Sequence, residues 1–568
     1  MPFRSKRPIN LSRFTVWITL AALILFVLLP TFYLISFVFL RWPEVNSEVF
    51  ENPIIGNENW NQILKVLFFS FRLSLSAIMF DLVFGIPLAY VLARKRFPGR
   101  NLVEDIVTLP LVMPTSGFGF ATLITWTTVT GIGGFLGLNS GIVTLETPVP
   151  FVNVTFMLFI VHVALTFPYI VRTVETKIES IDSTFETASR TLGASSLTTF
   201  RKILWPLTIP GVFSGTVLAF ARSLGETGAT IIVSGVSSTA SIAIVRWTAE
   251  FKLATAAFMG SLLVIIASAL ILPIEIYVGR EGHGLRFPYH FPSFLDRKLL
   301  KFERFVSRKL ARVKDLVPII VVVIAVIIPI IVVLNSVILF WSADPYTGKV
   351  QGGVLYQLFG PANYFNHLIQ ATLTSIIVAL TATYISMCIA IPLAFIIERR
   401  RYGGFIRSIL KVPMIIPTSS LGLSVLLLWG SNGFNLLSSG IWLIILTHTV
   451  FSVPVIVESI IPAYEGSEIQ MYEDSARTLG ATAYDSIEKV SLPLVKGGLL
   501  TGFILSFTRS LGETGATFVV MGRDVTVPAL VVNMVEALAI PAALFTSTFL
   551  IILSLILLAI IRIVTRKR

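Results

Sequence analysis

The sequence has few charged residues for its length. Asp, Glu, Lys and Arg make up 13% of the 568 residues, and apolar residues make up 55%. A soluble protein of this size carries about a quarter charged residues, so the charges here are too few to cover a large soluble core. Apolar runs of 18 or more residues recur along the chain, and the mean hydropathy is +0.85. The sequence therefore predicts an all-α integral membrane protein with many membrane-spanning helices.

Several kinds of functional site are absent from the sequence. Cys388 is the single cysteine, which excludes an intramolecular disulfide. No G-x-x-x-x-G-K-[ST] phosphate loop is present, so the chain cannot hydrolyse ATP on its own. The sequence also has no metal-ligand cluster and no catalytic nucleophile paired with a base. We therefore predict no catalytic residue, no metal site and no cofactor bound by this chain.

The net charge of +13 is distributed as membrane topology would distribute it. A nucleic-acid-binding protein gathers its basic residues on one soluble face, whereas these lie in short loops between apolar runs. Seven segments placed on one side of the membrane hold 35 of the 44 Lys and Arg residues: 1–13, 94–100, 172–202, 280–314, 399–411, 461–496 and 562–568. By the positive-inside rule this side is cytoplasmic. We expect a multi-pass protein of the cell membrane, with both termini in the cytoplasm and no nucleic-acid partner.

Twelve apolar segments are long enough to span a membrane, and an even number agrees with both termini on one side. The first follows the basic stretch MPFRSKRPINLSRF and is too long for the core of a signal peptide, so we expect it to be retained. The predicted spans are 14–40, 66–92, 104–128, 151–171, 207–233, 254–279, 316–340, 369–397, 408–429, 438–460, 497–521 and 540–562.

The chain contains an internal repeat. The stretch RSLGETGAT occurs at 222–230 and again at 509–517, and RTLGA occurs at 190–194 and 477–481, both at an offset of 287. Earlier matches have offsets of 303 to 305, which places about 17 extra residues in the first repeat, in the outer loop near 127–150. Two parallel repeats of six spans predict a pseudo-twofold permease with a shared central path.

The repeat divides the chain into three parts. The first six-span module covers 1–279, a basic cytoplasmic connector covers 280–315, and the second module covers 316–568. Apolar residues in the connector recur at helical spacing with Lys and Arg between them: Leu295, Leu299, Phe302, Phe305, Val306 and Leu310. This pattern favours an amphipathic helix lying on the membrane surface over a disordered charged linker.

Each module contains one long polar cytoplasmic loop, at 175–202 and at 465–496. Each loop has the pattern of a short helix, then Gly-Ala, then a second amphipathic helix that ends at a proline. Glycine after a helix supplies a tight or left-handed turn. The spacing is held in both copies although the flanking sequences differ, which favours a docking element over an ordinary connecting loop.

These loops resemble the EAA loop of ATP-binding-cassette importer permeases, whose pattern is E-A-A, three residues, Gly, nine residues and I-x-L-P. The spacing fits from Gly193 to Pro206 and from Gly480 to Pro493. The E-A-A triplet is replaced by Thr-Ala-Ser at 187–189 and by Asp-Ser-Ala at 474–476, with a glutamate one position earlier in each copy. The residues to which the resemblance assigns docking are Glu186, Ala188, Gly193, Ala194, Glu473, Asp474, Gly480 and Ala481.

The resemblance implies a division of labour. Two copies of a cytoplasmic ATPase subunit would bind ATP and Mg and would dock on the two loops. Their closure would drive the permease between inward-open and outward-open states, and an extracytoplasmic solute-binding protein would deliver the substrate. The alternatives are a twelve-span secondary transporter driven by an ion gradient, against which the two loops argue, and a membrane enzyme, for which no catalytic constellation is present.

The repeated nonapeptide places an arginine and a glutamate inside each apolar span. On a continuous helix, Arg222 and Glu226 share a face with Gly211 and Gly215, and the second repeat has the same arrangement in Gly498, Gly502, Arg509 and Glu513. Small residues at this spacing predict close helix packing. The charged residues therefore face protein, where they either line the translocation path or neutralise each other as a structural pair.

The same stretch resembles a G-E-F-G-A-T sequence of molybdate, tungstate and sulfate permeases, with Thr227 and Thr514 in place of phenylalanine. Fused double permeases are more typical of the iron(III) and thiamine importers, so a small oxyanion, iron(III) and thiamine all stay open as substrates. Four other polar residues lie in the spans, and we expect them to snorkel or to form hydrogen bonds between helices: Arg72, Asp81, His162 and His448.

Overall fold

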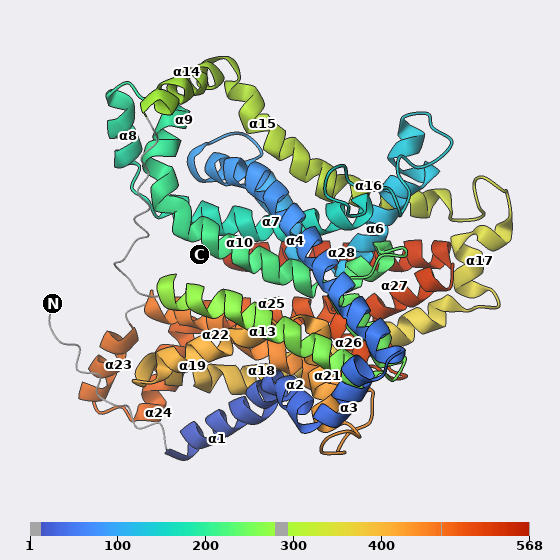
Figure 1. Cartoon of the computed structure of the whole chain (residues 1–568). Coiled ribbons are helices and arrows are strands. Elements are labelled where there is room, and N and C mark those ends of the chain that lie inside the picture. The colour runs from blue at the N-terminus through green and yellow to red at the C-terminus, as the bar shows by residue number, and fades with distance from the viewer. Residues whose placement is uncertain (1–12, 279–292, 467–468, 567–568) are drawn as a thin grey trace.

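The computed structural model describes residues 13–278, 293–466 and 469–566, and every regular element in these residues is a helix. Most helices are long, apolar and run side by side (Figure 1). The first repeat forms α1 (Arg13–Leu23), α2 (Leu29–Leu40), α3 (Trp42–Asn46), α4 (Ile55–Arg94), α5 (Arg100–Val112), α6 (Thr115–Thr127), α7 (Phe156–Glu179), α8 (Thr184–Thr191), α9 (Ser196–Thr199), α10 (Trp205–Gly225), α11 (Gly228–Val233), α12 (Ala240–Ala249) and α13 (Leu253–Val278).

The connector contributes one helix, and the second repeat follows the order of the first. The helices are α14 (Ser293–Lys309), α15 (Ala311–Val322), α16 (Ile328–Leu339), α17 (Val354–Phe359), α18 (Tyr364–Arg399), α19 (Gly403–Leu410), α20 (Val412–Ile415), α21 (Thr418–Trp429), α22 (Ile441–Glu465), α23 (Ile469–Thr478), α24 (Ala483–Ser486), α25 (Leu492–Gly512), α26 (Gly515–Val520), α27 (Val527–Glu536) and α28 (Ile540–Arg566).

The number of spans agrees with the sequence prediction. In the described residues, ten helices are long and apolar enough to cross a membrane, and two bent helix pairs bring the number to twelve. Several spans pass through a π-helical turn without interruption, as α1 and α2 do at Ile24–Leu28. The predicted all-helical, twelve-span class with two repeats is confirmed.

The predicted spans 104–128 and 408–429 are sharply bent, each at a break between two helices. Helices α5 and α6 meet at 112°, and the corresponding pair in the second repeat meets at 101°. Each break lies before a proline, at Met113 and Ile416, whose backbones are extended (ψ 139° and 136°). Proline disfavours the helical conformation in the residue before it, so Pro114 and Pro417 end the preceding helices.

The predicted spans 207–233 and 497–521 are also broken, which corrects the assumption of a continuous helix. Helix α10 ends at Gly225 and α11 starts at Gly228; α25 ends at Gly512 and α26 starts at Gly515. Glu226 and Glu513 have extended backbones, with ψ of 128° and 129°. Both glutamates therefore lie beyond the helix that carries the arginine, and the helical phase predicted for them is wrong.

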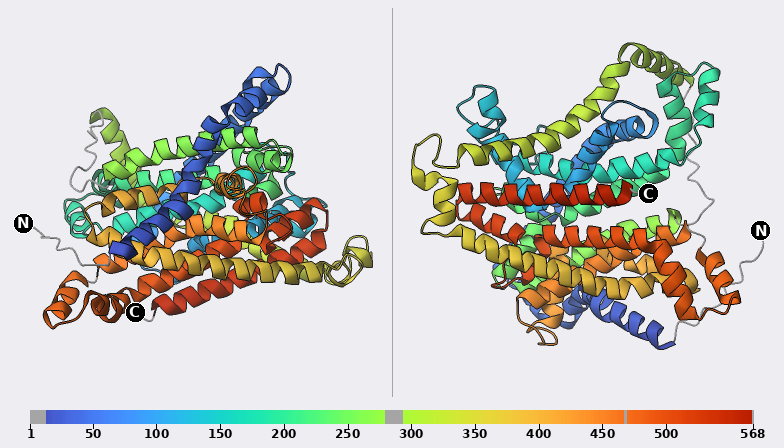
Figure 2. Two further views of the ribbon diagram at one scale, coloured as in Figure 1. Left: turned by 90° about the horizontal axis from the view of Figure 1, so that it is seen from below. Right: turned by 180° about the vertical axis from the view of Figure 1, so that it is seen from behind.

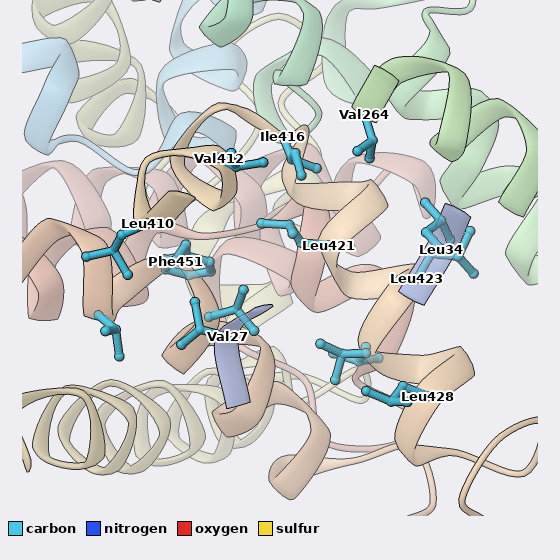
Figure 3. Packing of buried hydrophobic residues seen from close by; sticks show 14 of the residues in the cluster. Val27, Leu34, Val264, Leu410, Val412, Ile416, Leu421, Leu423, Leu428 and Phe451 are labelled. Carbon is cyan, nitrogen blue, oxygen red and sulfur yellow. The ribbon is translucent and has the colours of Figure 1, made fainter. Parts of the chain in front are cut away.

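The packed units do not follow the repeat boundary. One hydrophobic core joins α1–α3, α12 and α13 to α18–α23, α25 and α26, and the other joins α4–α7, α10 and α11 to α15, α16, α27 and α28. Figure 3 shows Val27 and Leu34 of the first repeat among Leu421, Leu423 and Phe451 of the second. Modules 1–279 and 316–568 are therefore repeats in sequence, but each packed bundle takes its outer spans from one repeat and its inner spans from the other.

The small-residue faces of α10 and α25 lie against their neighbouring helices. A Cβ added at Gly211 would lie 2.7 Å from Cβ of Lys177 on α7, and one added at Gly498 would lie 2.6 Å from the Ser459 carbonyl oxygen on α22. Gly215 and Gly502 meet the same two helices at 3.1 to 3.2 Å. These distances leave no room for a side chain, so the four glycines set how closely the helices approach.

We expect Gly498→Ala to destabilise the protein. The new methyl group would press on backbone at Ser459, and overpacking of this kind costs about 1–3 kcal/mol. The melting temperature of the detergent-purified protein should fall. Gly404→Ala on α19 is the matched control, because a Cβ there meets nothing within 4 Å. Equal melting temperatures for the two variants would contradict the close packing at Gly498.

The polar segments gather at one end of the molecule. Helices α8, α9 and α14 of the first part of the chain and α23 and α24 of the second lie there, beside the start of α1 and the end of α28 (Figures 1 and 2). The helix predicted in the connector is present as α14, and it packs on α9. Residues 280–292 of the predicted connector lie outside the described residues.

Candidate translocation path and docking segments

A cavity of about 320 Å³ lies where the four helix breaks meet. Its lining comes from both repeats and includes residues of the α5–α6, α10–α11, α20–α21 and α25–α26 breaks. All four charged residues proposed for the path line it: Arg222, Glu226, Arg509 and Glu513. A cavity of this volume is within the range of small-molecule sites in proteins.

The two copies of the nonapeptide touch each other at this cavity. A Cβ added at Gly228 would lie 2.6 Å from Oγ1 of Thr514, and one added at Gly515 would lie 2.6 Å from Oγ1 of Thr227. The glycines that end the preceding helices meet the opposite repeat's proline breaks, Gly225 at Pro417 and Gly512 at Pro114. Glycine is required here because two backbones cross with no space for a side chain.

Glu226 holds the first break together. Its carboxylate pairs with the Arg222 guanidinium and accepts a hydrogen bond of 3.0 Å from the backbone N–H of Ala229. The Glu226 side chain is 3% exposed and that of Arg222 is 28% exposed. The predicted ion pair is therefore present in the first repeat, although the helix ends between its two members.

The second break has a different arrangement. Glu513 accepts a hydrogen bond of 3.1 Å from the Ala516 N–H, but within the described chain no ion pair joins it to Arg509. The Arg509 guanidinium instead lies over the Phe451 ring, 4.9 Å from its centroid. Leu165 occupies the position of Phe451 in the first repeat, so Arg222 has no equivalent ring. Of the two alternatives left open, the structural ion pair is thus absent from the second copy among the described residues, although both residues line the cavity.

Two buried histidines brace the breaks. His162 on α7 is 2.7 Å from Ser223 Oγ and 3.2 Å from Thr230 Oγ1, which lie on either side of the first break. His448 makes the matching contacts with Ser510 and Thr517, at 2.7 and 3.1 Å. These are the hydrogen bonds between helices expected of both residues. They fix the angle between α10 and α11, and between α25 and α26.

The other polar residues of the spans lie apart from the cavity lining. Asp81 is fully buried and accepts a hydrogen bond of 2.5 Å from Thr166 Oγ1. Arg72 donates a long hydrogen bond of 3.4 Å to the Asn153 carbonyl. The hydrogen bond between helices that we expected is present for Asp81, whereas Arg72 contacts the loop that precedes α7.

The two polar loops predicted to dock a partner, called the docking segments below, have matching structures. In the first, α8 leads through Gly193 (φ +84°) and Ala194 to α9; in the second, α23 leads through Gly480 (φ +95°) and Ala481 to α24. A Cβ added at either glycine would meet nothing within 4 Å. The residues before the glycines, Leu192 and Leu479, are 88% and 89% exposed.

Glu186 and Glu473 lie inward, whereas Ala188 and Asp474 are exposed. Glu186 pairs at 2.6 Å with Arg94, the last residue of α4. Glu473 pairs with Arg399, the last residue of α18, in the same way. Both pairs are largely buried within this chain, so the two glutamates tie the docking helices to the longest spans. The surface open to a partner is formed by the exposed leucines, the glycines and their neighbours.

Arg94 and Arg399 were not predicted as functional residues. They stand 305 residues apart, an offset shared with the earlier matches between the repeats, and each ends an apolar run. This shared offset was the signal in the sequence that could have identified them. The offset alone does not identify the partner of each arginine. Arg94 contacts a glutamate 92 residues later in the sequence, and Arg399 contacts one 74 residues later.

The start of the first docking segment is fixed by Asp182. Its carboxylate accepts hydrogen bonds from the Thr184 N–H at 2.9 Å and the Thr184 hydroxyl at 2.7 Å. These two bonds lower the pKa of Asp182 below its ordinary value. The exposed carboxylate therefore stays ionised at the N-terminus of α8, where a negative charge is favourable.

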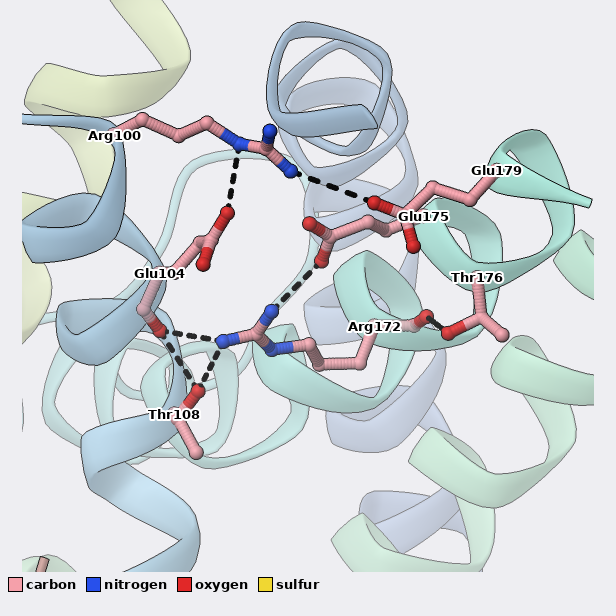
Figure 4. A network of polar contacts seen from close by, with 7 residues as sticks. All are labelled: Arg100, Glu104, Thr108, Arg172, Glu175, Thr176 and Glu179. Carbon is pink, nitrogen blue, oxygen red and sulfur yellow. Dashed lines mark hydrogen bonds and ion pairs between the residues drawn. The ribbon is translucent and has the colours of Figure 1, made fainter. Parts of the chain in front are cut away.

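The contact between the third and fourth spans has opposite polarity in the two repeats. Arg172 on α7 donates to the Glu104 carbonyl and to Thr108 on α5, and it pairs with Glu175 at 2.9 Å (Figure 4). In the second repeat Arg407 on α19 pairs with Glu458 on α22 at 3.0 Å. Arg407 stands at the position of Glu104, and Glu458 at that of Arg172. The arginine that joins these two spans thus lies on the opposite helix in the second repeat, and only there does it form an ion pair between the helices, because Arg172 contacts the Glu104 backbone and the Glu104 carboxylate pairs with Arg100.

Comparisons with known proteins agree with this geometry. The sequence profile of the family described as binding-protein-dependent transport system inner membrane component matches residues 85–279 and again 386–568. The molybdenum transport system permease protein of Escherichia coli K12 is 37% identical over 183 residues, which cover 31% of this chain and 73% of that protein. In the described residues, no three or more His, Cys, Asp or Glu side chains gather as metal ligands.

Two further relatives come from other organisms. The sulfate transport system permease protein of Salmonella typhimurium is 34% identical over 222 residues, covering 38% of this chain and 75% of that protein. The molybdate/tungstate transport system permease protein of Pyrococcus furiosus is 33% identical over 202 residues, covering 36% and 73%.

Proposed function

The chain belongs to the family of inner membrane components of binding-protein-dependent transport systems, and from this premise we propose that it forms the whole translocation path of an ATP-driven importer. One observation carries the proposal: the two copies of a charged nonapeptide cross at a central cavity, and two matching docking segments lie at one end of the same molecule. The first feature suits a closed gate, and the second suits a pair of driving subunits.

The substrate we propose is a small oxyanion such as molybdate, tungstate or sulfate. Three relatives that each match about a third of the chain are named for transport of molybdenum, sulfate, and molybdate or tungstate. Two guanidinium groups line the cavity, and guanidinium binds the oxygen atoms of anions through directed hydrogen bonds. These points favour an oxyanion over iron(III) and thiamine, which the sequence had left open.

In this proposal the crossed breaks are the gate of an alternating-access cycle. Two copies of a cytoplasmic ATPase would bind Mg-ATP and dock on α8–α9 and α23–α24. An extracytoplasmic solute-binding protein would deliver the anion at the opposite end. The docking end would face the cytoplasm, together with both termini, as the distribution of Lys and Arg predicts.

Glu226→Gln combined with Glu513→Gln should lower uptake several-fold. Each glutamate accepts a hydrogen bond from the first turn of the short helix after its break, and a neutral amide is a weaker acceptor than a carboxylate. The short helices at the gate would therefore be held less firmly in place. Uptake of radiolabelled molybdate or sulfate into vesicles holding the complete importer measures the effect. Unchanged uptake kinetics would favour a purely structural pair.

Gly193→Ala combined with Gly480→Ala should weaken ATPase binding. Both glycines have positive φ, which costs a non-glycine residue about 1–2 kcal/mol. The substituted segments would relax from this conformation and would have to regain it on binding, so the affinity would fall by up to about five- to thirtyfold. Binding of the purified ATPase to the detergent-solubilised chain measures the loss. Gly404→Ala serves as the control, and equal affinity for all three proteins would contradict the docking assignment.

A secondary transporter driven by an ion gradient is the competing function. It needs no ATPase, so the two proposals differ in one measurement. Uptake by vesicles holding the chain, the ATPase and the binding protein should stop when ATP is removed from the inside and should survive collapse of the ion gradients. Uptake that depends on the gradient and not on ATP would refute the importer.

A further inference from the structure

Helix α14 is bound to the first docking segment through one face. The buried Glu303 carboxylate accepts a hydrogen bond of 2.8 Å from Thr198 Oγ1 and pairs with Arg201. One turn later, Ser307 Oγ is 3.3 Å from Ser196 Oγ. The partners Ser196, Thr198 and Arg201 lie on α9 and the turn that follows it, directly after Gly193. The connector helix α14 is thus bound to the segment on which the ATPase would dock.

The opposite face of α14 is basic, aromatic and open. At about 100° per residue, Phe305 lies opposite the midpoint of Glu303 and Ser307, with Lys301 and Lys309 on its two sides. Phe302 and Phe305 are 63% and 51% exposed, and both lysines are exposed. The Lys309 ammonium lies 5.6 Å from the centre of the Phe305 ring. From Arg304 to Ala311 the sequence contains no acidic residue.

The chain holds this face near the membrane surface. Helix α14 ends at Lys309, α15 starts at Ala311, and the apolar run of the next span starts at Leu316. Two residues reach at most about 7 Å and the helical rise from Ala311 to Leu316 adds about 8 Å, so the end of α14 lies within about 15 Å of the apolar run and near the lipid headgroups. A helix with exposed phenylalanines flanked by lysines at this depth has the chemistry of an anionic-lipid contact.

We propose that α14 binds anionic lipid headgroups through Lys301, Phe302, Phe305 and Lys309, and that lipid charge thereby sets the position of the first docking segment. The second part of this inference rests on the proposed function. The connector occurs once in the chain, so the lipid acts on one docking segment and not on the other. Lipid composition then regulates the importer through one of its two ATPase docking segments, so the two ATPase copies dock in different surroundings.

The lipid contact can be measured on the full chain without any partner. A polarity-sensitive fluorophore is placed on Arg304→Cys in a Cys388→Ser background, and the protein is reconstituted in phosphatidylcholine vesicles with or without phosphatidylglycerol. We expect the emission to shift to the blue only with phosphatidylglycerol, and high salt to reverse the shift. Identical emission in the two lipids would overturn the proposal.

Two sets of substitutions on α14 test its chemistry. K301Q/F305S/K309Q should abolish the blue shift, whereas K301R/F305L/K309R, which keeps the charge and the apolar side chain, should retain it. An equal blue shift in the two variants would overturn the assignment of these residues to the lipid-binding face of α14. If the emission ignores phosphatidylglycerol and responds only to added ATPase, the face is a protein contact instead.

Regulation is tested in the complete importer. Phosphatidylglycerol should raise uptake by the wild type and by K301R/F305L/K309R, but not by K301Q/F305S/K309Q. A blue shift with no effect of lipid on uptake would overturn the regulatory step and leave the lipid contact standing. Failure of the ATPase to bind any variant or the wild type would instead overturn the proposed function, with the fluorescence result unaffected.

Discussion

Replacing Arg94 and Arg399 together by glutamine should lower ATP-driven uptake at least about tenfold while the ATPase continues to hydrolyse ATP. Each arginine ends a long span and pairs with the buried glutamate of a docking helix. Breaking a buried ion pair by removing one partner costs about 3–5 kcal/mol, because the remaining charge is left without compensation. The docking helices would then move without pulling α4 and α18. Parallel assays of ATP hydrolysis and uptake measure the separation.

The chain supplies a matched control for this experiment. Arg96 and Arg401 stand two residues beyond the first pair, at the same offset of 305, and both are exposed. Arg96→Gln with Arg401→Gln removes the same charge from the same end of the molecule. The coupling of ATP hydrolysis to uptake should survive this change. Lysine at both positions, in Arg94→Lys with Arg399→Lys, should retain part of the coupling that the glutamine variant at 94 and 399 loses. Normal uptake by the glutamine variant at 94 and 399 would mean that movement of the docking helices is transmitted to the spans through other contacts.

Arg222→Gln and Arg509→Gln should have different effects, although the two residues are equivalent in the repeat. Arg222→Gln leaves the Glu226 carboxylate, 3% exposed, without its counter-charge, so we expect a fall of several degrees in melting temperature together with loss of uptake. Arg509→Gln breaks no ion pair with any residue that the structure describes. It removes a contact with Phe451, and cation–π contacts are worth about 0.5–2 kcal/mol, so the melting temperature should change little.

Uptake should still fall at least about tenfold in Arg509→Gln, since a hydrogen bond to a charged group contributes about 1.5–3 kcal/mol and Arg509 is the guanidinium left available to an anion. Thermal denaturation and oxyanion uptake of both variants test this division. Phe451→Leu, which makes the second repeat resemble the first, is the control for the ring. Equal melting temperatures and equal uptake in the two arginine variants would contradict the unequal roles.

Hydropathy predicted the larger features of the molecule. Twelve apolar segments, a repeat offset near 287 and two helix–glycine–helix loops were all visible in the sequence, because each depends on composition or spacing along the chain. The position of Gly193 and Gly480 after short helices followed from the need for a left-handed turn. The interior breaks were missed because helical phase was counted through Gly225, Glu226 and Gly228 as if the helix continued.

The contacts across the cavity could not be predicted from local pattern. Phe451 and Arg509 are 58 positions apart, and nothing in either span identifies them as neighbours. The pairing of Glu186 with Arg94 has the same character, since both lie in polar stretches where several partners were available. A repeat offset could have singled out the candidates, but only packing shows which charge each one meets.

The exchange of outer spans between the two bundles has a consequence for how the protein is made. Helices α1–α3 are synthesised more than 300 residues before α18–α22, yet they share one hydrophobic core with them. They must therefore lie beside temporary neighbours in the bilayer until the second repeat is synthesised. A ribosome that stalls in the connector would leave both bundles incomplete, and the first half expressed alone would be a substrate for membrane proteases. Neither bundle can be completed until the last spans are synthesised.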